Sequence, residues 1–333
     1  MRYPWFSYLA LTCALLAFCV VVLGAYVRLS DAGLGCPDWP GCYGHLTIPN
    51  TAGEIAKANS EFPDRPVEAP KAWKEMAHRY FASTLGLLIL VIAGYAWRFR
   101  RRQDLPLKLP MFLVALVIFQ GLLGMLTVTL LLKPFIVLLH LLGGMATLAL
   151  LWLLFLRSTN LFAAVSGAGS KLRNFAFVGL VVVVLQIALG GWTSSNYAAL
   201  ACPDFPTCQT QWWPQMDFTE GFILWRGLGV DYEGGVLDNP ARVAVHMAHR
   251  LGAIVTLLFI GMLSILSIAG NLPRHVKITG AFVGVFLLLQ ISLGISTVKF
   301  GLPLVLAAAH NGMAALLLLS LVSLSYFLRQ PNQ

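Results

Sequence analysis

Charged residues are scarce in this chain of 333 residues. Asp, Glu, Lys and Arg together make up 11% of it, whereas 58% of the residues are hydrophobic. Soluble globular proteins usually carry about 25% charged residues. The composition therefore excludes an ordinary soluble domain and indicates a protein that lies in a lipid bilayer.

Acidic residues are scarcer than basic ones, with 14 acids against 23 bases and a net charge of +9. Many of the bases gather at the ends of apolar segments, and nothing resembles a basic groove with interleaved aromatic side chains. We interpret the basic excess as membrane topology and headgroup contact. The expected partner is a lipid bilayer, and no nucleic acid is expected.

Eight apolar stretches are long enough to cross a bilayer, which takes about 20 residues each. We predict an all-α membrane protein with eight transmembrane helices at 5–27, 78–97, 109–132, 135–156, 175–193, 243–269, 278–298 and 303–328. The first stretch is too long for the apolar region of a signal peptide and lacks an obvious cleavage site, so we expect a retained helix.

The basic residues also predict an orientation. They mark the three short connections at 98–108, 157–174 and 270–277, whereas thirteen of the fourteen acids lie on the opposite side. Short basic connections stay in the cytoplasm. We therefore expect a multi-pass protein of the cell (inner) membrane with both termini cytoplasmic and the two long loops outside.

The second half of the sequence repeats the first. Met-Ala-His-Arg occurs at 76–79 and 247–250, CPDWPGC at 36–42 matches CPDFPTC at 202–208, and the Gln and Gly of 120–124 recur at 290–294. Such a repeat indicates two related structural units. We expect two four-helix bundles, 1–160 and 175–333, joined by a cytoplasmic linker at 161–174.

Only six cysteines occur, and four of them form two C-x5-C pairs in the outer loops. Cys13 and Cys19 lie within the first apolar stretch and are expected to pack as small hydrophobic residues. On an oxidising outer face the paired cysteines form disulfides. The links Cys36–Cys42 and Cys202–Cys208 would each close a short loop, but pairing across the halves stays open.

Four histidines occupy repeat-related positions: His78 and His140 in the first half, His249 and His310 in the second. Ionisable groups in membrane segments are costly and default to functional candidates. We place His78 and His249 at outer helix ends and the other two about two turns into helices that also begin outside. Two facing histidines in a bundle suit heme iron, and neither half offers the further ligands of a structural zinc site. A hydrogen-bonded surface role is the alternative.

Glu75 distinguishes the two halves. It precedes His78 by three residues and shares its helix face, whereas the second half has His246 at this position. A carboxylate beside a heme can act as a base toward water or stabilise positive charge. An acid favoured by the helix dipole is the alternative. The difference indicates one reactive half and one electron-handling half.

Two further groups of residues suit a heme. Small residues near the histidines leave space for a flat macrocycle, with helix packing as the alternative; they are Gly86, Gly143, Gly144, Gly252 and Gly312. Arginines at outer helix ends suit propionates because Arg binds carboxylates in a bidentate manner, and snorkelling to headgroups is the alternative; they are Arg28, Arg79, Arg242 and Arg250.

Over essentially its whole length the chain resembles the heme A synthases, on the strength of the two four-helix halves, the Glu75-x-x-His78-Arg79 motif, the other three histidines and both cysteine pairs. The resemblance implies an oxidoreductase that converts the C8 methyl of heme O to the formyl of heme A by successive hydroxylations, with water as the oxygen source. It implies that Glu75 is catalytic, that His78 and His140 serve the substrate heme, and that His249 and His310 ligate heme b.

The resemblance also implies partners and leaves alternatives open. Heme O synthase and an electron acceptor are expected partners, and a homo-oligomer stays open. His246 is either a relic of the glutamate or an alternate ligand to His249. A diheme cytochrome would use the histidines but not Glu75, a thiol oxidoreductase would use only the cysteines, and a transporter would typically show inverted repeats.

Overall fold

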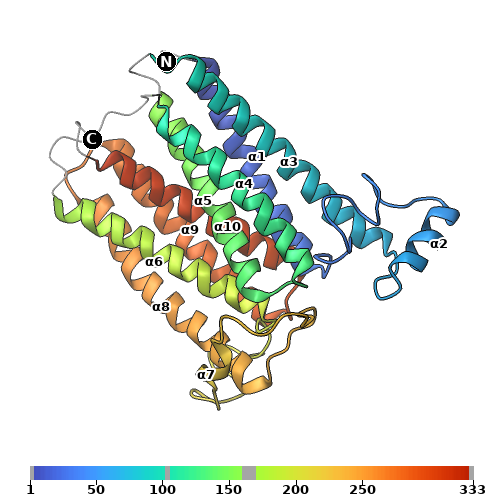
Figure 1. Cartoon of the computed structure of the whole chain (residues 1–333). Coiled ribbons are helices and arrows are strands. Elements are labelled where there is room, and N and C mark those ends of the chain that lie inside the picture. The colour runs from blue at the N-terminus through green and yellow to red at the C-terminus, as the bar shows by residue number, and fades with distance from the viewer. Residues whose placement is uncertain (1–3, 102–105, 160–169, 330–333) are drawn as a thin grey trace.

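The computed structural model describes residues 4–101, 106–159 and 170–329, and within these ranges the chain forms helices and loops without any β-strand. The helices are α1 (Pro4–Leu29), α2 (Ala52–Glu61), α3 (Ala69–Arg98), α4 (Lys108–Thr129), α5 (Pro134–Thr159), α6 (Ser170–Ser195), α7 (Phe218–Gly221), α8 (Asn239–Ala269), α9 (Arg274–Lys299) and α10 (Leu304–Phe327) (Figure 1).

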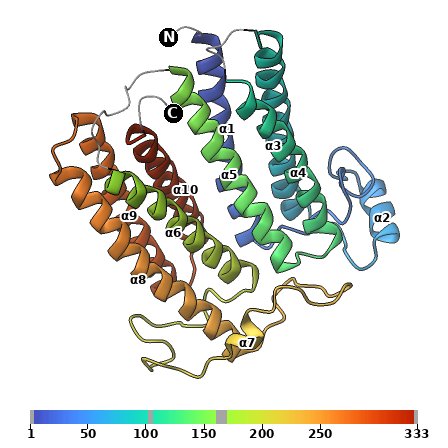
Figure 2. The same ribbon diagram turned by 60° about the vertical axis from the view of Figure 1, so that its left-hand side comes forward.

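Eight of the described helices, all except α2 and α7, are long and apolar enough to cross a membrane. The predicted fold class, an all-α membrane protein with eight spanning helices, is therefore confirmed. The short helices α2 and α7 belong to the two long loops, which gather at one end of the helices (Figures 1 and 2).

Several helices begin earlier than their apolar stretches. Helix α3 starts at Ala69 and α8 at Asn239, each with a proline in its first turn. The Asp238 side chain caps α8 by accepting a hydrogen bond from the Ala241 N–H at 3.0 Å. Hydropathy detects only the apolar part of a helix, so the predicted helix starts were too late. In the structure, His78 and His249 lie more than two turns inside their helices rather than at the starts.

Helix α6 likewise begins within the segment expected to be a linker. It starts at Ser170, so residues 170–174 of the expected 161–174 linker are helical. The rest of that linker lies outside the described residues, and the domain boundaries stay a prediction.

The spanning helices contact one another as two rings. Helices α1, α3, α4 and α5 form one ring, and α6, α8, α9 and α10 form the other. Between the rings, α1 contacts α10, and α5 contacts both α6 and α10 (Figure 2). Helices at equivalent places in the sequence repeat thus occupy equivalent places in the two rings.

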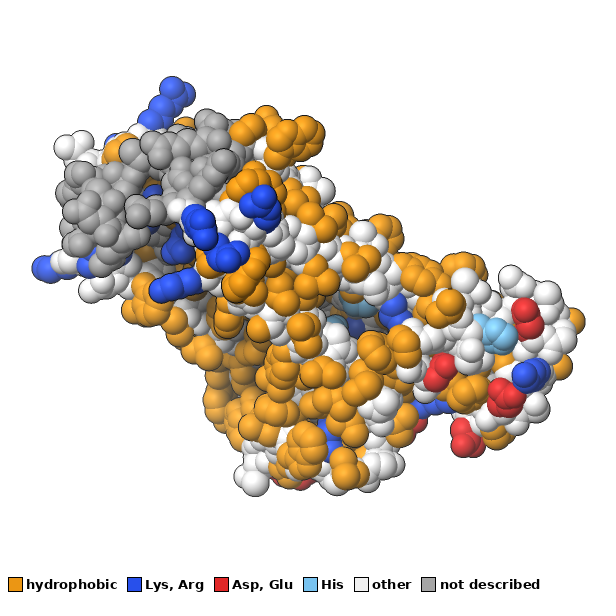
Figure 3. All heavy atoms as spheres, turned by 45° about the horizontal axis from the view of Figure 1, so that its top comes forward, with side chains coloured by type: hydrophobic (Ala, Val, Ile, Leu, Met, Phe, Trp, Pro, Cys, Tyr) orange, Lys and Arg blue, Asp and Glu red, His pale blue; other side chains and the backbone are white. Residues whose placement is uncertain are grey.

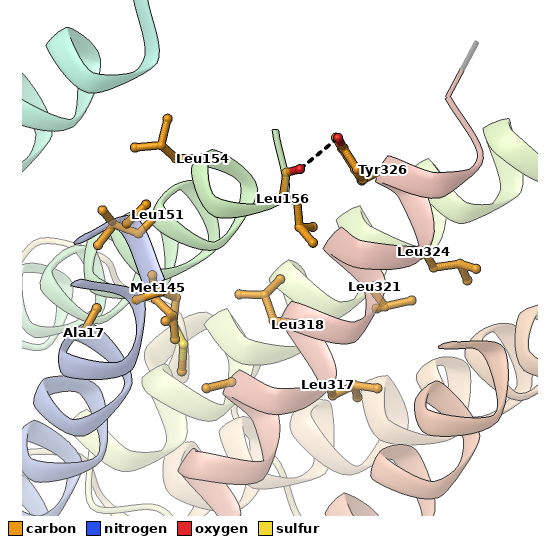
Figure 4. Packing of buried hydrophobic residues seen from close by; sticks show 14 of the residues in the cluster. Ala17, Met145, Leu151, Leu154, Leu156, Leu317, Leu318, Leu321, Leu324 and Tyr326 are labelled. Atoms are coloured by element: carbon orange, nitrogen blue, oxygen red, sulfur yellow. Dashed lines mark hydrogen bonds between the residues drawn. The ribbon is translucent and has the colours of Figure 1, made fainter. Parts of the chain in front are cut away.

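The core between the rings is mostly aliphatic. Buried leucines of α5 and α10 belong to one apolar cluster with Met145 of α5 and Ala17 of α1 (Figure 4). Two polar contacts at the same boundary join the halves: the Tyr326 hydroxyl donates to the Leu156 carbonyl at 3.0 Å, and the Trp152 indole donates to the Ser323 hydroxyl at 2.8 Å. Burial of apolar side chains and these two bonds fix the helix ends that lie opposite the long loops.

Charge separates along the molecule. Lysines and arginines gather at the end that carries the termini, the acids lie around the long loops, and apolar side chains cover much of the surface between them (Figure 3). This separation matches the distribution from which the orientation was predicted.

The two long loops also join the halves. Arg65 of the first loop forms ion pairs with Asp231 and Glu233 of the second. Lys133, at the start of α5, is 2% exposed, donates to the Gly227 carbonyl at 3.0 Å and lies over the Trp225 ring. Residues 225 and 227 of the second long loop therefore contact the chain just before α5 of the first half.

Candidate functional site

Each of the four histidines faces a glycine on a neighbouring helix. A Cβ atom built on Gly24 would lie 2.9 Å from His78 Cε1, and one on Gly190 would lie 3.1 Å from His249 Cε1. The other two pairs, Gly124 with His140 and Gly294 with His310, give 3.5 and 2.9 Å. A Cβ at Gly24, Gly190 or Gly294 would press against the ring, so these three glycines limit where the imidazoles lie, whereas one at Gly124 would make an ordinary van der Waals contact.

For three of the four histidines, the backbone carbonyl of the residue four positions before the glycine is an acceptor beside the ring. His310 Nδ1 lies 3.1 Å from the Gln290 carbonyl. The carbonyls of Val20 and Gln120 are the neighbouring acceptors of His78 and His140, whose Nδ1 atoms are buried without a well-formed hydrogen bond. A histidine whose Nδ1–H points at a carbonyl leaves Nε2 free to bind a metal.

The two histidines of the first half face each other. The ring centroids of His78 and His140 are 6.5 Å apart and their planes are nearly perpendicular. The first-half pair therefore brings two imidazoles from different helices close enough to be candidate ligands of one metal ion.

The second half brings His249 and His310 together but surrounds them with more polar groups. Gln186 Nε2 lies 3.1 Å from His249 Nδ1, and Gln290 Nε2 lies 3.2 Å from His310 Nε2. Iron binding at His310 Nε2 therefore requires the Gln290 amide to turn away. Its counterpart Gln120 already does so in the first half, where it fills the space over Gly143.

Glu75 lies at the centre of a hydrogen-bonded group in the first half. It is 5% exposed; its Oε2 accepts from the Cys36 N–H at 2.9 Å, and its Oε1 lies 2.5 Å from Arg79 Nη2. A buried carboxylate with donors on both oxygens has a fixed position. Because it stands three residues before His78, it lies on the same side of α3 as the histidine pair.

The second half has no carboxylate at this position. His246 is buried, and its Nδ1 lies 2.9 Å from the Ala198 carbonyl. This bond joins the ring to the long loop between α6 and α8. The structure thus places Glu75 and His246 at equivalent positions, each bonded to the loop of its own half.

Both disulfide-bonded loops have the same construction. Cys36–Cys42 and Cys202–Cys208 are linked within their loops, with Cα atoms 4.8 and 4.5 Å apart. In each loop an aspartate accepts two backbone N–H bonds from the turn after the second cysteine; Asp38 bonds Tyr43 and Gly44 at 2.6 and 2.7 Å. Burial, together with the nearby carboxylates of Glu68 and Asp38, raises the pKa of Tyr43 to about 12.

The four arginines expected at propionates divide into two pairs. Arg79 and Arg250 donate to backbone carbonyls of the disulfide loops. Arg28 donates to the Ser194 carbonyl at 2.8 Å and lies over the Tyr197 ring. Arg28 and Arg242 each retain a buried Nε without a hydrogen-bond partner, so these two have donors left for a propionate.

The glycines expected to line a heme mainly contact other helices. A Cβ atom on Gly143 would collide with Gln120 Nε2 at 1.8 Å, and one on Gly252 would meet Gln186 Oε1 at 2.3 Å. The nearest neighbours of Gly86, Gly144 and Gly312 are aliphatic or aromatic side chains. Sequence reasoning missed the pairing of Gly24 and Gly190 with histidines, although their 166-residue separation matches that of the cysteine loops.

Comparison with known proteins identifies the family. The family model of the COX15-CtaA cytochrome oxidase assembly proteins matches residues 7–322. A protein of Shewanella oneidensis named heme A synthase is 47% identical over 329 residues, which cover 98% of this chain and 97% of that protein.

Two proteins with the same name from Agrobacterium fabrum and Caulobacter vibrioides are 29% and 27% identical. The matches cover 90% and 96% of this chain and 84% and 94% of the two relatives. Since the family model and the relatives extend over nearly the whole chain, the chain belongs to the COX15-CtaA family of cytochrome oxidase assembly proteins.

Proposed function

We propose that this chain is a heme A synthase, which oxidises the C8 methyl group of heme O to the formyl group of heme A in the cell membrane. Family membership and the name of the Shewanella relative support the reaction. The observation that carries it in this chain is the buried Glu75 carboxylate, which stands three residues before His78 of the His78–His140 pair, whereas the second half has His246 at this position.

The first half would hold the substrate. His78 and His140 would be the ligands of the heme O iron, and the unpartnered Nε of Arg28 is available for a propionate. Arg242 is the corresponding candidate for a propionate in the second half. Heme O synthase is the expected supplier of the substrate.

Glu75 is placed to act on the reacting carbon. Conversion of a methyl to a formyl group with one oxygen atom from water releases four electrons and four protons. The carbon becomes electron-poor before water adds, and a nearby carboxylate stabilises it and accepts the proton of the attacking water. After a second hydroxylation the gem-diol loses water to give the aldehyde.

The second half would hold the resident cofactor, heme b, with His249 and His310 as its ligands. Heme b, when bound, supplies one-electron transfer between the substrate site and an external acceptor. The Gln290 carbonyl beside His310 Nδ1 and the Gln186 amide beside His249 Nδ1 would orient the two rings, and the Gln290 side-chain amide would leave His310 Nε2 when heme binds.

The substitution Glu75→Gln tests the proposal because it keeps the size and hydrogen-bonding capacity of the side chain but removes its charge. We expect purified Glu75→Gln protein to keep the optical spectrum of heme b and to accumulate heme O or a hydroxylated intermediate. Loss of one preorganised electrostatic contact should slow heme A formation by about 100-fold.

The matched control is His246→Gln, which changes the equivalent position of the other half. It should leave heme O binding in the first half intact and show its effect in the heme b spectrum. Normal heme A formation by Glu75→Gln would show that the carboxylate is only an acid favoured by the helix dipole and takes no part in the reaction. Absence of heme A formation by the unsubstituted protein would instead favour a diheme electron carrier.

A further inference from the structure

Arg79 contacts two parts of the first half at once. Its Nη2 lies 2.5 Å from Glu75 Oε1, one helical turn earlier on α3. Its Nη1 donates to the carbonyls of Asp38, Pro40 and Gly41 in the disulfide-bonded loop. A guanidinium carries five N–H donors in one rigid plane, so a single arginine can join a loop to a carboxylate.

The same loop holds the other oxygen of the carboxylate. The Cys36 N–H donates to Glu75 Oε2 at 2.9 Å. The loop approaches α3 so closely that a Cβ on Gly35 would lie 2.7 Å from the carbonyl carbon of Lys71. Glu75 is therefore held from the loop through Cys36 and from its own helix through Arg79.

The second half shows what the loop contact does without a carboxylate. Arg250 donates to the carbonyls of Cys202, Asp204 and Thr207 at 3.1, 2.7 and 2.8 Å. The residue four positions before it is His246, which bonds to Ala198 instead. The arginine–loop contact is thus common to both halves, and only the first half adds the arginine–carboxylate contact.

We propose that Arg79 is a positioning residue for Glu75 and that the disulfide-closed loop 36–42 is the rigid frame that holds Arg79. This inference rests on the proposed role of Glu75 in the oxidation of heme O. A glutamate side chain rotates about several single bonds, and small displacements of a catalytic group cost large factors in rate. Donors on both oxygens confine the carboxylate to one place beside the substrate.

The first experiment compares Arg79→Gln and Arg79→Lys in the full-length, heme b-loaded protein, with heme O as the varied substrate. We expect Arg79→Gln to lower kcat by about 10- to 100-fold and to change KM by less than about threefold. Arg79→Lys should recover part of kcat, since an ammonium reaches Glu75 but cannot also bridge the loop carbonyls. A rise in KM with unchanged kcat would instead mean that Arg79 binds a propionate, and would overturn the inference.

The second experiment places the Arg79 variant in the Glu75→Gln background. If Arg79 acts through Glu75, Arg79→Gln causes no further loss of kcat there. Arg250→Gln is the matched control, because it removes the same loop contact where no carboxylate is present. The loss of kcat caused by Arg250→Gln should multiply with the loss caused by Glu75→Gln in the double variant.

The outcomes separate the two hypotheses. Suppose that Glu75→Gln lowers kcat and that the loss of kcat caused by Arg79→Gln multiplies with it in the double variant. Arg79 then only supports the fold. In that case the inference is wrong and the proposed function stands. If Glu75→Gln converts heme O at the normal rate, the assignment of Glu75 fails and this inference fails with it. Should Arg79→Gln not accumulate with an intact heme b spectrum, the same cycle is measured with Arg79→Lys.

Discussion

At the scale of residues, the site depends on the contact between an imidazole and a glycine. The four pairs join helices that are neighbours in space: α1 with α3, α4 with α5, α6 with α8 and α9 with α10. A ring packed against a bare backbone has little freedom to rotate, because protein interiors contain few voids. Each histidine can therefore present the same nitrogen to a ligand without a large hydrogen-bond network.

This packing predicts the effect of filling the space at Gly294. In Gly294→Val the new Cβ would lie 2.9 Å from His310 Cε1, so the imidazole must move. Overpacking of this kind costs about 1–3 kcal/mol, and we expect most of the low-spin heme b to be lost. The pyridine hemochrome and the optical spectrum of the purified protein measure that loss.

Two further variants calibrate the result. His310→Leu removes the proposed ligand and gives the spectrum expected for complete loss of heme b. Gly261→Val is the control, since the nearest atom to a Cβ at Gly261 is 4.0 Å away. Full heme b content in Gly294→Val would contradict the assignment of His310 as a ligand.

At the scale of elements, each half combines a spanning helix with the loop that precedes it. The starts of α3 and α8 extend beyond the apolar stretches, and the arginine after each histidine binds the disulfide loop of the same half. The loop thus completes the outer end of the helix that carries the histidine. A closed loop of this length has few conformations, so it can hold several backbone groups in fixed positions.

The loops predict the cysteine chemistry of the protein. Peptides from unreduced protein should contain the links Cys36–Cys42 and Cys202–Cys208, because each pair has Cα atoms within the normal disulfide range. Mass spectrometry after alkylation should find Cys13 and Cys19 as the free thiols. A link between Cys36 or Cys42 and a cysteine of the second half would contradict the structure of both loops.

At the scale of the whole molecule, the distribution of charge distinguishes the two ends of the spanning helices. The basic end and the loop end lie at opposite ends of the spanning helices (Figure 3). Both histidine pairs lie nearer the loop end of the spanning helices than the basic end, since His140 and His310 are each the seventh residue of a helix that begins at the loop end. Both heme sites are therefore expected near the outer face.

Single-cysteine labelling tests this orientation. In a background in which Cys13 and Cys19 are replaced by alanine, Ser60→Cys should react with a membrane-impermeant maleimide in spheroplasts, because α2 belongs to an outer loop. Asn271→Cys, in the short connection between α8 and α9, should react only in inverted vesicles or after lysis. The opposite pattern would place the loops and both heme sites on the cytoplasmic side.

The sequence alone was sufficient for the fold class and for the identity of the candidate residues. The eight spans follow from the lengths of apolar runs, and the equivalence of His78 with His249 and of His140 with His310 follows from the repeat. These features depend on short stretches of sequence or on identical residues at equivalent positions of the repeat, so no knowledge of packing is needed. Glu75 stood out for the same reason, because its counterpart in the repeat is His246.

Only the tertiary structure decided which groups surround those residues. Gly24 touches His78 across 54 positions of sequence, and Arg79 reaches Gly41 across 38. Hydropathy also placed the start of α3 nine residues late, because its first turns lie in the polar loop region and carry no apolar signal. Contacts between helices depend on how the rings close and on which side chains leave space, and neither is a property of any short stretch of sequence.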